Sequence, residues 1–292
     1  MNSTHMYTPT FDSCWAKLKR AREHRDSLND FIIETGKVEH NCPRIGIRFA
    51  RATGEHVVFV NRMPDLADFL ERGSVIIGDV AHNLRSALNH MTYQMALKNL
   101  GGQFPNASSE IRVQFPMEDR REMFERRKLA NGPKDTGAWI ADLCADDQAF
   151  IEFYQPGQGQ NVRPARRGHS YHPMQALRDI SNMDKHRLPV RLFGAPTSMY
   201  EVDLGAGMII SGHIERTLAE SGTIQTAFLE AGADLFWATM PGWSETNTDM
   251  AGYVAPQIAL PDGRDVIEVI DRITEGTVAI IAEINPRPEL TL

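Results

Sequence analysis

The stretch Asp79-Val-Ala-His-Asn-Leu-Arg-Ser-Ala-Leu-Asn-His90 places two histidines, an arginine and several amide or hydroxyl side chains within about three helical turns. At about 100° per residue, apolar residues fall on one side of this predicted helix and polar residues on the other. The apolar stripe comprises Ile77, Val80, Leu84, Ala87, Leu88, Met91 and Met95, and the polar stripe comprises Asp79, His82, Asn83, Ser86, His90 and Tyr93. Because Lys and Glu, which usually solvate a helix, are missing from the polar stripe, we predict that it is a functional face.

The composition is that of a soluble globular protein with a sizeable core. The chain has 292 residues, of which 42% are hydrophobic and 24% are charged. No run approaches the roughly 18 apolar residues that a membrane span requires, and residues 1–10 lack the apolar core of a signal peptide. The cysteines, Cys14, Cys42 and Cys144, are far apart and form no Cys-x-x-Cys pair. We therefore expect free thiols, a cytoplasmic location and no membrane partner.

Charge is distributed unevenly along the chain. Residues 1–191 carry 27 Lys or Arg against 23 Asp or Glu, whereas residues 192–292 carry 4 against 15. An acidic C-terminal third repels polyanions, so any nucleic acid is expected to meet the first two-thirds. Basic clusters occur there at residues 120–128 and 163–167, although solvated helix faces and loops account for most clusters of this kind.

The periodicity predicts an α+β protein. Helices are expected over 11–35, 74–100, 120–129, 139–154, 174–186 and 265–284, a β-hairpin over 43–49 and 57–60, and β-like runs at 188–193, 208–212, 223–229, 235–239 and 253–260. Helical periodicity already begins at Leu66, with a potential break at Gly73, and Gly101-Gly102 ends it. The prediction is long polar-faced helices packed beside an antiparallel sheet. A mainly helical region with the hairpin, 1–187, and a β-rich region with a closing helix, 188–292, would pack as one unit.

Two segments of the chain carry a resemblance to known proteins. The first is Gly78-Asp-Val-Ala-His-Asn-Leu-Arg-Ser-Ala-Leu-Asn-His90, and the second is Asp184-Lys-His-Arg187. In these segments and in the order of its elements, the chain resembles a widespread group of bacterial proteins that have no assigned activity. The resemblance covers most of the chain and implies no reaction.

Arg85 and His90 carry a second resemblance. Their Arg-x-x-x-x-His spacing is similar to that of HEPN ribonucleases, all-helical dimers that cut RNA without a metal. This resemblance implies RNA as partner, a homodimer, no cofactor and a role of the toxin or phage-defence type. The predicted hairpin and β-rich tail are not part of the all-helical HEPN fold.

Arg85 and His90 also suit this reaction chemically. Metal-free RNA cleavage needs a group that exchanges a proton near neutral pH and a cation that stabilises the charged phosphorane, and histidine and arginine meet these needs. Five residues apart on a helix, the two side chains diverge by about 140°, so they meet at one phosphate only at a helix end or across a dimer. The second segment is expected to complete the site. The candidate catalytic residues are Arg85, His90, His82, His186, Asp184 and Lys185.

A non-catalytic interpretation accounts for the same residues. His82 and His90 would hydrogen-bond to Asp184 and Asn182 in a buried polar network that fixes how the helices pack. The protein would then be a binding or regulatory protein whose cluster is structural.

A metal site is the third interpretation. Asp79-x-x-His82 places a carboxylate and an imidazole one turn apart, and His90 and His186 would add ligands for a metal-dependent hydrolase or oxidase. Helical dimetal proteins use several glutamates, however, and neither predicted helix contains Glu-x-x-His. The chain also lacks the motifs of phosphate-loop hydrolases, dinucleotide enzymes, serine esterases and zinc proteases.

Overall fold

The structure is a computed structural model of the chain. It describes residues 7–130, 135–158, 171–185, 191–193, 199–203, 209–213, 231–232, 234–238, 251–253, 257–260 and 264–287. The chain divides into two compact units. Unit 1 comprises Met1–Arg25, Ile77–Leu188 and Val269–Leu292, and unit 2 comprises Asp26–Ile76 and Pro189–Glu268.

The fold is α+β, as the sequence predicts. The helices are α1 (Asp12–Gly36), α2 (Ala67–Asn99), α3 (Ala107–Arg112), α4 (Arg121–Lys128), α5 (Ala145–Phe153), α6 (Pro173–Lys185) and α7 (Val266–Ile284), with 3₁₀ turns η1 (Glu39–Asn41) and η2 (Pro156–Gln158). The strands are β1 (Arg44–Ala50), β2 (Glu55–Arg62), β3 (Arg191–Phe193), β4 (Met199–Asp203), β5 (Ile209–His213), β6 (Asp234–Ala238), β7 (Ala251–Tyr253) and β8 (Gln257–Ala259).

All regular structure described in unit 1 is helical. Each residue of the predicted apolar stripe of α2 is no more than 3% exposed, which confirms the side of the helix that faces the core. Helix α1 contacts the segment of α7 and the residue that follows it: Trp15 Nε1 donates to Asn285 Oδ1 at 3.1 Å, and Arg25 donates to both carboxylate oxygens of Asp271 at 2.7 Å. Two contacts near opposite ends of the paired segments therefore fix this packing.

The predicted end of α2 is confirmed. The helix stops at Asn99, and Gly101 and Gly102 follow with φ angles of 72° and 99°. Left-handed backbone of this kind favours glycine, because a side chain is strained there. The glycine pair thus turns the chain away from α2 toward α3.

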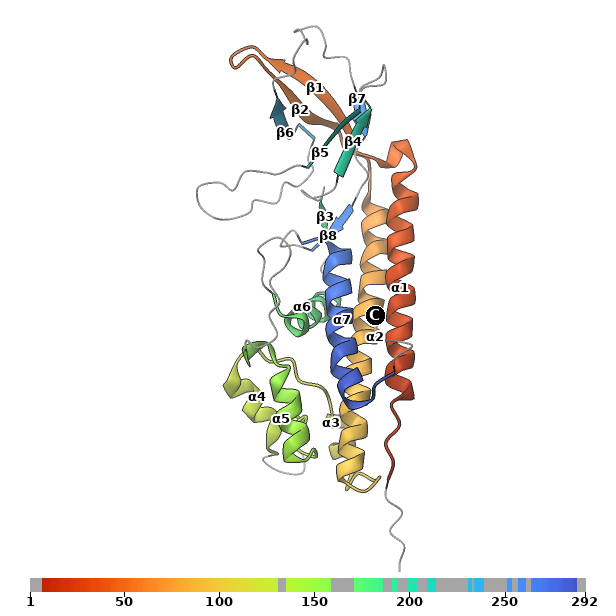
Figure 1. The fold of residues 1–292 in the computed structure, drawn as a ribbon, viewed down its shortest axis with the longest axis vertical. Helices are drawn as coiled ribbons and strands as arrows, with labels where there is room; N and C mark the ends of the chain where they lie inside the picture. Colours follow the sequence, from red (N-terminus) through yellow and green to blue (C-terminus); the bar gives the residue numbers. More distant parts are fainter. Residues whose placement is uncertain are drawn as a thin grey trace, which may run out of the picture. The chain divides into compact units, whose positions relative to one another are not determined.

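The described strands all belong to unit 2. The predicted hairpin is present as β1 and β2, joined through Gly54 at φ 73°. These strands form the middle of an antiparallel four-stranded sheet in the order β6-β2-β1-β7 (Figure 1), and β3–β8 and β4–β5 form separate antiparallel pairs. The β-rich tail therefore returns to both edges of the hairpin.

The ends of two helices pack within unit 2. The rings of Phe31 on α1 and Phe69 on α2 stack with centroids 5.1 Å apart, and the Arg72 guanidinium lies 4.8 Å from the Phe31 centroid. Gly73 is buried, and a Cβ atom there would lie 2.5 Å from Cδ1 of Ile258 on β8. Helix and strand thus make close contact at Gly73.

The break expected at Gly73 is wrong. Helix α2 runs without interruption from Ala67, and the absence of a side chain at Gly73 admits Ile258 instead of ending the helix. The start expected at 74 is therefore seven residues late.

The helix expected over 139–154 begins only at Ala145. The backbone N–H of Ile140 donates to the Arg127 carbonyl at 2.9 Å instead of to a helical neighbour.

Helix α3 and strand β4 were not predicted, because each is too short for its periodicity to stand out. The run expected at 223–229 lies outside the described residues. No helix among the described residues is long and apolar enough to cross a membrane.

Candidate functional site

The polar stripe of α2 divides into exposed and enclosed residues. Asp79 and His82 are exposed, Ser86 and His90 are half-buried, and Asn83 is buried. Asn83 is satisfied within its own helix, since its Nδ2 donates to the Asp79 carbonyl at 2.8 Å. The stripe is therefore not uniformly open, and its accessible part begins at the Asp79–His82 end.

Several polar residues of α2 hold neighbouring segments in place. Asn89 Oδ1 accepts a hydrogen bond from the Phe115 backbone N–H at 3.0 Å, and the Tyr93 hydroxyl donates to Glu110 Oε1 at 2.8 Å. Both partners lie on or just after α3. These side chains attach the α3 segment to α2, a scaffolding role consistent with the non-catalytic interpretation.

Gln94 binds the segment that leads into α1. Its Oε1 accepts hydrogen bonds from the Tyr7 hydroxyl at 2.6 Å and from the Thr10 backbone N–H at 3.1 Å. Helix α2 therefore has one polar flank toward α3 and another toward the N-terminal segment.

Arg85 differs from these residues because no described residue provides it with a counter-charge. Its side chain is half-buried, and burial lowers the pKa of its guanidinium from the usual value. No hydrogen bond or ion pair joins it to another residue within the described ranges. A cation that loses part of its hydration, with no counter-charge among the described residues, is a candidate anion ligand.

His90 is also half-buried and lies near α1. Burial and, secondarily, the positive charge of Lys17 lower the pKa of its imidazole. His90 is therefore neutral at pH 7, which is the form that accepts a proton.

Arg85 and His90 lie on different flanks of α2. Residues four apart on a helix are surface neighbours, so Arg85 lies beside Asn89 on the α3 flank, and His90 lies beside Gln94 on the N-terminal flank. His82 is three residues before Arg85 and exposed. Within one molecule, His82 is therefore the histidine better placed to share a ligand with Arg85.

The second predicted segment is described only in part. Asp184 and Lys185 are the last two residues of α6, and His186 lies outside the described residues. Asn182, a proposed partner of the histidines, is exposed. The joining of the two segments into one cluster stays a prediction.

The residues proposed as metal ligands are only partly brought together in the described structure. Asp79 and His82 are one turn apart on the exposed side of α2, and the further ligand His186 is not described. Among the described residues, no group of three or more His, Cys, Asp or Glu side chains is arranged to hold a metal ion.

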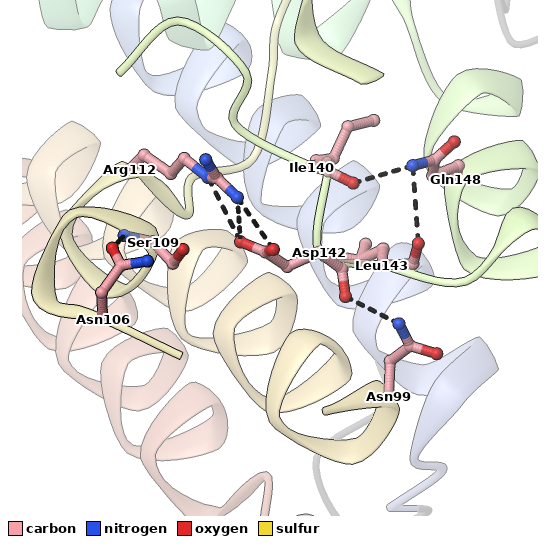
Figure 2. A network of polar contacts seen from close by, with 8 residues as sticks. All are labelled: Asn99, Asn106, Ser109, Arg112, Ile140, Asp142, Leu143 and Gln148. Carbon is pink, nitrogen blue, oxygen red and sulfur yellow. Dashed lines mark hydrogen bonds and ion pairs between the residues drawn. The ribbon is translucent and has the colours of Figure 1, made fainter. Parts of the chain in front are cut away.

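Arg112, in contrast with Arg85, has a counter-charge among the described residues. Figure 2 shows its guanidinium against the Asp142 carboxylate, with the closest contacts at 2.7 and 2.8 Å. The Asp142 carbonyl accepts from Asn99 Nδ2 at 2.9 Å, and Gln148 Nε2 donates to the Ile140 carbonyl at 2.9 Å and to the Leu143 carbonyl at 3.5 Å. This network ties α2, α3 and α5 together, and its groups are satisfied by one another. It is a structural network.

The sequence patterns did not predict that Glu110 and Phe115 bond to side chains of α2, because they did not predict helix α3. One signal was present: Asn106 precedes the helix, and its Oδ1 accepts from the Ser109 backbone N–H at 2.9 Å (Figure 2). Asparagine at this capping position is typical of a helix start.

Known proteins add no further assignment to this geometry. Comparison with protein-family models, with curated proteins and with solved structures found no match to the chain.

Proposed function

We propose that this protein is a HEPN-like, metal-independent ribonuclease in which Arg85 binds the scissile phosphate of RNA. The half-buried Arg85 guanidinium, without an acidic partner among the described residues, is the observation that carries the proposal. A phosphate would restore the compensation that the partly dehydrated cation lacks. Arginine is suited to this role because its planar fork of N–H donors matches the oxygens of a phosphate.

The histidines supply the proton transfers. A neutral imidazole takes the proton of the ribose 2′-hydroxyl, which attacks phosphorus, and a protonated group returns a proton to the leaving 5′-oxygen. His82 can act beside Arg85 on the same helix, whereas His90 would reach the phosphate from a second copy, as in a dimer. The lowered pKa of His90 supports the role of base.

The division of the chain also favours the HEPN resemblance. Arg85 and His90 belong to unit 1, whose described regular structure is helical, and the described strands belong to unit 2. The parts that depart from an all-helical fold are therefore separate from the unit that holds the candidate residues.

Cleavage of RNA by the purified full chain in EDTA tests the proposal. A panel of end-labelled single-stranded RNAs is expected to give products with 2′,3′-cyclic phosphate ends. Arg85→Gln should slow cleavage at least about 100-fold, because it removes the charge that stabilises the transition state. His82→Ala and His90→Ala should each cost about 10²–10⁴-fold if both transfer protons.

His40→Ala is the matched control, because His40 is an exposed histidine of unit 2. It should leave cleavage unchanged. Absence of EDTA-resistant cleavage across the panel would refute the proposal, and so would cleavage that survives Arg85→Gln.

The non-catalytic function remains the second candidate, favoured by the bonds from Asn89, Tyr93 and Gln94 to neighbouring segments. These bonds give polar side chains of α2 a structural role. RNA binding without cleavage, lost in Arg85→Gln, would support a binding protein that uses the same cation.

A further inference from the structure

His172 caps the N-terminus of α6 with its imidazole ring. The backbone N–H of Met174 donates to Nδ1 at 3.2 Å, and the His172 carbonyl accepts the first helical bond from Ala176 at 3.1 Å. A ring nitrogen that accepts a hydrogen bond carries no proton, so the neutral ring has its proton on Nε2. The residue is only 5% exposed.

The other ring nitrogen, Nε2, meets no acceptor in the described part of the chain. Nε2 is buried without a hydrogen-bond partner among the residues that the structure describes. The charged group that faces the ring from α7 is Arg272, whose guanidinium also lies 4.6 Å from the ring centroid of the neighbouring Tyr171. Glu275, the acid that follows on α7, is exposed. The surroundings of His172 therefore favour a neutral ring.

The capped end of α6 rests against α7. A Cβ atom on Gly276 would lie 3.0 Å from Cβ and 3.3 Å from Cγ of Pro173, the first residue of α6. Gly276 lies one turn after Arg272. His172, Pro173 and Gly276 thus lie at one junction between α6 and α7. Protonation of His172 would place a positive charge at this junction.

We infer that His172 is an acid-sensitive lock, which holds the first turn of α6 against α7 when its ring is neutral and releases it when the ring is protonated. A proton on Nδ1 destroys the acceptor that binds the Met174 N–H. It also places a positive charge beside Arg272 and at the positive end of the α6 dipole. These three effects all favour separation of the helix end from α7.

The size of the response follows from the two protonation equilibria. Burial, and then the charge of Arg272, lower the pKa of His172 from 6.5 to about 4. If the released ring returns to its ordinary value, the ratio of released to locked α6 rises about 20-fold between pH 7 and pH 5.

Hydrogen exchange of the full chain measures this release. After correction for the pH dependence of chemical exchange, the amide protons of residues 174–180 should lose about 20-fold protection between pH 7 and pH 5. Residues 12–25 of α1 serve as the internal reference for global unfolding, whose free energy also falls with pH, so at pH 5 the α6 segment should remain clearly less protected than α1. Equal protection of the two segments at pH 5 would overturn the inference, because the whole unit would then be opening together.

His172→Asn is the decisive variant, because asparagine also caps helices but does not titrate. Its α6 protection should be nearly the same at pH 7 and pH 5. A wild-type-like acid response in this variant would overturn the inference. Should the variant fold poorly, ¹⁵N spectra of the wild-type histidines provide a second test. One ring should keep its proton on Nε2 alone down to about pH 5. Titration of all described histidines near pH 6.5 would contradict the inference.

Discussion

Arg85 and Arg112 are two arginines of unit 1 whose surroundings are opposite. Arg112 is 6% exposed and contacts both oxygens of Asp142, whereas Arg85 is half-buried and has no acidic partner in the described part of the chain. Removing a charge from water costs free energy, which a counter-charge or a charged ligand offsets. The residue that we propose to bind RNA is therefore distinguished from Arg112 by having no acidic partner among the described residues.

Substitution of the two arginines should give opposite changes in stability. Arg85→Met is expected to leave the free energy of unfolding unchanged or raise it by about 1 kcal/mol, because methionine fills the site without a dehydrated charge. Arg112→Met should lower it by about 3 kcal/mol or more, because Asp142 loses its partner. Urea unfolding at pH 7 measures both. A loss above 1 kcal/mol in Arg85→Met would identify Arg85 as a structural residue.

At the scale of elements, two helix glycines make close contacts of different kinds. Gly276 on α7 faces the rigid ring of Pro173, and Gly73 on α2 faces Cδ1, the mobile end of Ile258. Alanine gains about 1 kcal/mol of helix propensity over glycine at either position. The net change in stability therefore depends on whether the neighbouring side chain can move away from the new methyl group.

Gly276→Ala is expected to destabilise the protein by about 1 kcal/mol, because the proline ring cannot turn away and α6 must shift. Gly73→Ala should be close to neutral, since rotation of Ile258 relieves the contact. Thermal unfolding of the two variants beside the wild type makes the comparison. Equal or greater stability of Gly276→Ala would show that the junction of α6 and α7 is loosely packed.

At the scale of the whole molecule, two histidines make stability depend on pH. The pKa values of His90 and His172 are both lowered in the folded protein, the latter to about 4. Between pH 6.5 and pH 4 the unfolded chain therefore binds more protons than the folded one. The stability that the neutral rings of these two histidines contribute is fully present above pH 6.5 and is lost as the pH falls through their lowered pKa values.

The loss from His172 alone is expected to reach about 3 kcal/mol at pH 4. Urea unfolding at pH 7, 6, 5 and 4, at low protein concentration because the pI is about 5.8, measures it. His172→Asn should reduce the slope of stability against pH. An unchanged slope would mean that carboxylates, and not this ring, govern the response to acid.

Local periodicity was sufficient to predict most of the helices and the hairpin. The apolar stripe of α2 and the glycine pair that ends it depend on neighbours within a few residues, so they could be derived from the sequence. The prediction failed where a distant segment decides the outcome, as when Ile258 packs into Gly73 and when Ile140 bonds to Arg127 instead of starting a helix.

The candidate site shows the same distinction. The sequence by itself determined that Arg85, His82 and His90 share a helix and lie outside its apolar stripe, because the helical repeat sets these directions. Only the tertiary structure decided which polar groups of α2 have hydrogen-bond partners in other segments. Asn89 is satisfied by Phe115, 26 residues away, while Arg85 meets no described acid. The hydrogen-bond partners and counter-charges of these side chains come from segments that are remote in sequence. A local sequence pattern therefore cannot predict which side chains of α2 have a partner.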